Sequence, residues 1–182
     1  MADTGYIYPG TVVNDTSIGS NPTPAWADPS NAKTSNDSYA IVTENTTGGT
    51  TNYLYAYNFG ISIPSNNLIT GIAAFIERKR ITIGTPCYDY EVKLVTAGGV
   101  LSTNKADTLT GWPTSDAGES YGGSTDTWGE IFSPSDVNNV SFGFVLSVST
   151  NGLYPPIQIC VDCMYMQIFY TPIVYVIDSF IM

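Results

Sequence analysis

The stretch "VSFGFVLSV", Val140 to Val148, decides the fold class, because its residues alternate in character. Every second position is apolar, namely Val140, Phe142, Phe144, Leu146 and Val148. The positions between them are small or polar, apart from Val145. Successive side chains of a β-strand point to opposite faces, so this alternation predicts a strand with one apolar face.

Four further apolar runs precede this stretch and are separated by turn-rich clusters, which predicts four more strands. They cover Tyr39–Thr43, Asn52–Ile63, Leu68–Ile83 and Tyr88–Ala97. The connections "ENTTGG" and "PSNN" have the length and the residue types of hairpin loops. In the last run Asp89, Glu91 and Lys93 share one parity, which predicts that they lie together on a solvated face.

Composition supports an all-β domain. The chain has 182 residues, of which 43% are hydrophobic and only 12% charged, with 13 Tyr and many residues that favour turns. This length suits one domain with a core of its own. A long polar region, 106–139, has one helix-start signal, with Ser133 as N-cap, Pro134 at the first helical position and Asp136 in the first turn.

The two ends of the chain differ from this strand pattern. Residues 1–38 are rich in Pro, Gly and Asn and predict an extended arm, which either wraps its own domain or contacts a neighbouring subunit. Residues 39–171 form the predicted sandwich, and 172–182 form a C-terminal tail. The apolar side chains of the tail either fold back or dock on a neighbour, so they are candidate interaction residues. They are Ile173, Val174, Tyr175, Val176, Ile177 and Phe180.

The cysteines near the C-terminus have the Cys-x-x-Cys spacing of metal and redox sites, but they lie in an alternating segment that predicts a strand. Cys160 and Cys163 are three positions apart and therefore point to opposite faces, unless a bulge shifts the register. The chain has no His, and Cys87 is the only other cysteine. We therefore expect a core thiol at Cys163, a second thiol on the other face, and no metal site.

No residue set specifies a reaction. Without His the chain lacks the usual general base, and Asp89 and Glu91 share their predicted face with a lysine. The sequence therefore predicts a protein that is not an enzyme and has no cofactor. Trp26, Trp112 and Trp128 either form a platform for sugar rings on loops or close the ends of a β-sandwich as core residues.

Charge limits the choice of partners. The formal net charge is -10, which argues against nucleic acid and against anionic membranes. The N-terminal segment has an acid at Asp3 and no apolar run after it, so it does not resemble a secretory signal. We therefore expect synthesis in a cytoplasm.

Five segments resemble a β-sandwich module that recurs in the structural proteins of tailed bacteriophages. They are "WADPSNAKTSNDSYAIVT", "TTNYLYAYNFGISIPSNNLITGIAAFIERK", "YGGSTDTWG", "FSPSDVNNVSFGFVLSV" and "VDCMYMQIFYT", which together span about Trp26 to Thr171. Typical members share a Trp before an "NPSNA" box, a strand ending in "IERK" and a closing strand ending in "YYT". The two cysteines of the last strand and the apolar tail depart from this pattern.

The resemblance implies a single jelly-roll-like antiparallel β-sandwich and a place in the virion, with synthesis in the cytoplasm of a bacterial host. We expect a capsid decoration or cement protein that binds the major capsid protein or other virion subunits and forms a homo-oligomer, with a trimer favoured. Alternatives are a tail or fibre component that contacts the host surface, and a carbohydrate-binding module that uses the three Trp residues.

Overall fold

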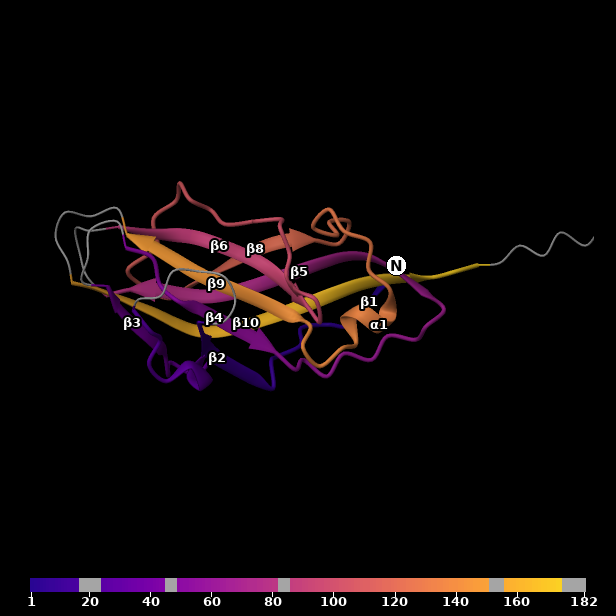
Figure 1. The fold of residues 1–182 in the computed structure, drawn as a ribbon, viewed down its shortest axis with the longest axis horizontal. Coiled ribbons are helices and arrows are strands. Elements are labelled where there is room, and N and C mark those ends of the chain that lie inside the picture. The colour runs from indigo at the N-terminus through magenta and orange to yellow at the C-terminus, as the bar shows by residue number, and fades with distance from the viewer. Residues whose placement is uncertain (17–23, 45–48, 82–85, 151–155, 175–182) are drawn as a thin grey trace, which may run out of the picture.

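The computed structural model describes residues 1–16, 24–44, 49–81, 86–150 and 156–174, which form two antiparallel sheets packed face to face (Figure 1). The first sheet contains β1 (Ala2–Asp3), β3 (Ala40–Glu44), β5 (Asn67–Arg80), β8 (Ala117–Gly123) and β10 (Ile157–Pro172). The second contains β2 (Thr11–Asp15), β4 (Tyr53–Tyr57), β6 (Cys87–Thr96), β7 (Gly99–Val100) and β9 (Gly143–Thr150). Two short turns of helix, η1 (Pro29–Ala32) and α1 (Pro134–Val137), lie between strands.

The strand order is that of a jelly roll. In the first sheet β3 pairs with β10, β10 with β5, and β5 with β8. In the second sheet the order is β4, β9, β6 and β7. From β3 onward the chain changes sheet at each connection except that between β6 and β7, as two Greek keys require. The predicted all-β sandwich is confirmed, but the predicted hairpins are wrong, because β4 lies in a different sheet from both β3 and β5.

β9, which contains most of the alternating segment Val140–Val148, lies at the centre of the second sheet. Phe142, Phe144, Leu146 and Val148 are fully buried between the sheets, as their alternation predicts. The expectation is wrong for Val140, which is 64% exposed because the strand begins only at Gly143. The opposite face of β9 is also covered, because Val145 packs under Tyr53 and Tyr55 of β4.

A β-bulge in β6 changes which side chains enter the core. Asp89 pairs with Val148 and Glu91 with Ser147, so Tyr90 is an extra residue on this strand. The side chain of Asp89 therefore points inward and is completely buried, whereas Tyr90 is exposed. The prediction that Asp89 and Glu91 share a solvated face is wrong for Asp89.

The described part of residues 1–38 belongs to the sandwich and is not an arm outside it. β1 pairs with β10, β2 pairs with β4, and Trp26 is buried in the core. Single bridges from Ile7 to Met166 and from Lys33 to Cys163 continue the cover along β10. Each of these contacts pairs only a few backbone groups, so a turn-rich segment can form them. Together the contacts protect one edge of β10, the longest strand.

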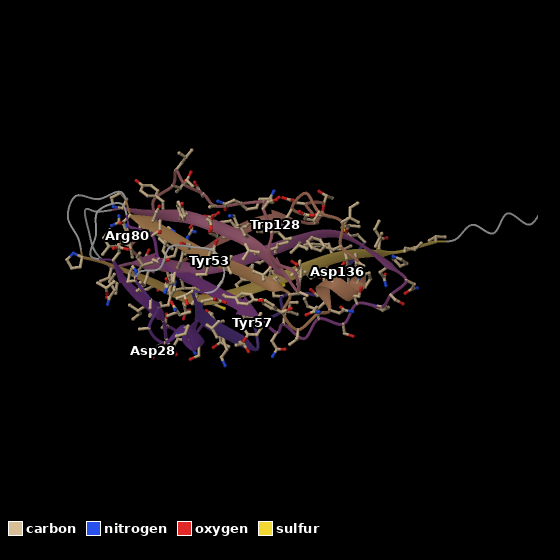
Figure 2. The ribbon with its side chains drawn as sticks, viewed as in Figure 1. Asp28, Tyr53, Tyr57, Arg80, Trp128 and Asp136 are labelled. Carbon is tan, nitrogen blue, oxygen red and sulfur yellow. The ribbon has the colours of Figure 1, made fainter. Side chains whose placement is uncertain are left out.

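The long polar region also contributes to the core. It contains β8, which the sequence did not indicate, and it buries Trp112 and Trp128. The predicted helix start is confirmed: the Ser133 side chain caps α1, and the Asp136 carboxylate accepts a hydrogen bond from the Ser133 backbone N–H. Figure 2 labels Asp136 on this turn.

Candidate functional site: a buried charge cluster and two apolar surfaces

The three tryptophans do not form an exposed platform. Trp26, Trp112 and Trp128 are all at most 3% exposed. Each indole N–H donates to an interior acceptor, which is the Asn52 carbonyl for Trp26 (2.9 Å) and the Ile72 carbonyl for Trp128 (2.9 Å). The sugar-stacking hypothesis is therefore wrong for these residues, and their alternative reading as core residues holds in this structure.

Trp112 belongs to a charge cluster buried between the two sheets. Its indole N–H donates to Asp89 Oδ1 (2.8 Å), and Arg78 Nη1 forms an ion pair with the same oxygen (2.5 Å). Tyr121 donates its hydroxyl to Asp89 Oδ2 (2.8 Å), and the backbone N–H of Asp107 reaches this oxygen at 3.1 Å. The guanidinium of Arg78 lies 4.8 Å from the centre of the Trp112 ring.

This charge cluster joins four parts of the chain through one carboxylate. Burial alone would lower the pKa of Arg78, but the charge and hydrogen bond of Asp89, together with Tyr121 and Glu119, outweigh it and raise that pKa. Burial and the same carboxylate raise the pKa of the Tyr121 hydroxyl. Because Asp89 and Arg78 are 0% and 3% exposed, the cluster is out of reach of a substrate and links β5, β6, β8 and the 101–116 loop.

The two cysteines of β10 lie on the same face of the sheet, contrary to the sequence prediction. Val161 pairs with Arg78 and Cys163 with Glu77, so Asp162 forms a bulge between them. Cys160 faces the same way because its partner is Lys79, which like Glu77 points away from the core. The expectation of a core thiol at Cys163 is therefore corrected: both thiols lie on the outer face.

Both thiols are nevertheless buried, and residues 33–41 lie alongside this part of β10, where Lys33 bridges to Cys163 and Ile41 pairs with Cys160. All three cysteines are free. Burial raises the pKa of Cys160 to about 11 and the pKa of Cys163 to about 12. Within the described ranges, no group of three or more Cys, Asp or Glu side chains is placed to hold a metal ion.

We expect these thiols to resist labelling in the folded protein. A thiol reacts as its thiolate, and the raised pKa values keep Cys160, Cys163 and Cys87 protonated in mildly alkaline buffer. A disulfide reagent should label none of them within minutes, and all of them in guanidinium chloride. Leu109→Cys, at a position that is 88% exposed, is the control that should react at once. Rapid labelling of the unmodified chain would contradict the structure.

One apolar surface lies where β10 leaves the sandwich. Leu68 at the start of β5 is 49% exposed and pairs with Thr171. Beyond Thr171 and Pro172, Ile173 and Val174 are 41% and 82% exposed. Pairing continues past Pro172, since the Ile173 N–H donates to the Asn66 carbonyl (2.9 Å). Of the predicted tail residues, Tyr175, Val176, Ile177 and Phe180 lie outside the described residues.

A second apolar surface, which sequence reasoning missed, lies on the outer face of the first sheet. It consists of the rings of Tyr6, Tyr8, Phe75 and Tyr165, and we call it the aromatic patch. Tyr6 and Tyr8 are 60% and 48% exposed. Tyr6 and Tyr8 are two residues apart, which is the spacing of side chains on one face of an extended segment. The turn-rich composition around them concealed this pattern.

No helix in the described parts of the chain is long and apolar enough to cross a membrane.

Comparisons with known proteins do not assign the chain to a family. No protein-family model matches the chain, and no curated protein matches it.

Proposed function

We propose that this protein is a structural component of a bacteriophage virion, most simply a decoration protein that binds the assembled shell. The observation that carries the proposal is the apolar end of β10. Val174 is 82% exposed, Ile173 and Leu68 beside it are 41% and 49% exposed, and the sequence continues with Tyr175, Val176 and Ile177. Water-exposed apolar surface of this kind is typical of a docking site.

Three further observations support this proposal. The jelly-roll order of the sheets is common among viral capsid domains, although the fold by itself does not define a function. The resemblance of the five segments points to the same class of protein. The ionisable cluster around Asp89 is buried and links structural elements, so its side chains serve the stability of the domain.

The proposal can be tested on phage shells that lack this protein. The purified chain is added to shells of a phage that encodes it, and co-sedimentation measures binding. We expect Val174→Asp to weaken binding by at least tenfold, because a carboxylate would have to be buried at the contact. Leu109→Asp, at an equally exposed apolar position on the 101–116 loop, should bind like the original chain.

Electron microscopy of the same particles gives the position of the protein. Density on the shell supports a decoration role, whereas density confined to the tail or the fibres identifies it as a tail or fibre component and contradicts the decoration role. No binding to any part of the particle would contradict the virion assignment as a whole.

A further inference from the structure

The aromatic patch is built on paired strands in the middle of the first sheet. Tyr165 of β10 lies directly opposite Phe75 of β5, and their rings stack with centres 4.8 Å apart and planes 8° apart. Their neighbours Met164 and Met166 are buried in the core, so Tyr165 and its partner point to the outer face.

The N-terminal segment completes the patch along the edge of β10. Ile7 forms a bridge with Met166 and packs against the core, so Tyr6 and Tyr8 on either side of it point outward. The Tyr6 ring lies 5.2 Å from the rings of both Phe75 and Tyr165, and Tyr8 lies 5.5 Å from Tyr165. The four side chains therefore form one continuous aromatic surface across two strands and the edge segment.

This surface is suited to an apolar peptide. Exposed Tyr rings give large contact areas at a low cost in side-chain entropy, and they are enriched at protein interfaces. The charged groups at adjoining positions are Glu77, Asp3 and Lys33. Glu77 follows Phe75 on the same face of β5. Asp3 accepts a hydrogen bond from Gln167, and Lys33 forms a bridge with Cys163. None of them lies within the row of rings, so the centre of the patch is uncharged.

The chain itself contains a segment with the complementary composition. The tail from Ile173 to Met182 has Asp178 as its single charged residue, and most of its other residues are apolar. It begins just after β10 ends at Pro172, and Val174 lies nine positions after Tyr165 in the chain. At about 3.3 Å per residue, its own patch lies about 30 Å behind it, so the tail would have to reverse direction to reach it. A tail from another molecule needs no reversal.

We propose that the tail, Ile173–Met182, docks in an extended conformation on the aromatic patch of a second copy of this chain. Residues of one parity, Ile173, Tyr175 and Ile177, contact the rings. A contact between two different surfaces of identical subunits closes into a ring when the rotation between them permits, so this contact agrees with the expected trimer. The inference rests on the proposed role in assembly, but it does not depend on the identity of the shell.

The test uses two defective variants that should complement each other. The first carries Tyr6→Ser and Tyr8→Ser and retains its tail, and the second lacks 173–182 and retains its patch. Sedimentation velocity should show that the original chain self-associates and that each variant associates at least tenfold more weakly. An equimolar mixture should form a heterodimer, because one intact tail then meets one intact patch. Tyr90→Ser, on the other sheet and 45% exposed, is the matched control and should self-associate normally.

Each other outcome overturns the inference. A mixture that stays monomeric would show that the tail of one copy does not dock on the patch of another. Normal association of the patch variant would show that the tail docks elsewhere, and a monomeric original chain would exclude self-association altogether. The shell-binding experiment keeps its meaning in all of these cases, so failure of this inference is distinguishable from failure of the proposed function.

Discussion

Replacing Asp89 by Ala should lower the free energy of unfolding by about 3–5 kcal/mol, since Arg78 would then remain buried without its main counter-charge. Three neutral donors would also lose their acceptor: the Trp112 indole, the Tyr121 hydroxyl and the Asp107 backbone N–H. Glu119 could compensate only weakly, because it lies 3.4 Å from Arg78 and its side chain is 41% exposed. Urea denaturation followed by Trp fluorescence measures the loss.

Two controls separate the charge effect from the general effect of mutation. Lys93→Ala removes an ion pair with Glu91 whose side chains are 18% and 20% exposed, and it should cost no more than about 1 kcal/mol. The double variant Arg78→Met, Asp89→Leu removes both charges and should be more stable than Asp89→Ala. If Asp89→Ala unfolded at the same urea concentration as Lys93→Ala, the cluster would not hold the sheets together.

Gly143→Ala should cost at least about 3 kcal/mol, the upper end of the range for an overfilled interior. A Cβ atom at this position would lie 2.0 Å from the Ala56 carbonyl oxygen of β4. β9 pairs with β4 on one side and β6 on the other, so the backbone of Gly143 cannot move away without breaking a ladder. We expect a large fall in the melting temperature, measured by circular dichroism.

Gly118→Ala is the matched control for this change. Gly118 lies in β8 at the edge of the first sheet, and a Cβ atom there would meet no atom within 4 Å. This substitution should leave the melting temperature unchanged within a few degrees. Equal melting temperatures for the two variants would contradict the described packing of β4 against β9.

The sequence predicted those elements whose own residues determine them. β9 was recognisable because Phe142, Phe144 and Leu146 all require one buried face, and this requirement does not depend on the neighbouring strands. The start of α1 was recognisable because Ser133 and Asp136 satisfy the free backbone groups of the first turn locally. Such local signals hold whichever sheet an element joins.

Features that depend on distant partners were not predictable in this way. Tyr90 is an extra residue only with respect to the register of β9, and Asp162 only with respect to that of β5. After each of these bulges, the side chains that follow point to the opposite face from the one that simple alternation predicts. Asp89 therefore became the buried centre of a cluster, although its local pattern was that of a solvated strand. The aromatic patch depends in the same way on an edge contact between Ile7 and Met166, which are far apart in the sequence.

The place of β10 in the first sheet also affects how the chain is made. This strand lies between β5 on one side and β3 and β1 on the other, yet it comes last in the sandwich (Figure 1). β3 and β5 therefore emerge from the ribosome before β10, the strand that pairs with both, has been synthesised. Until residues 157–172 have emerged, both strands have unpaired edges, and the core residues beneath them face water. Closure of this sandwich must therefore follow translation of its last strand, and the strand pairing it completes joins segments far apart in the sequence.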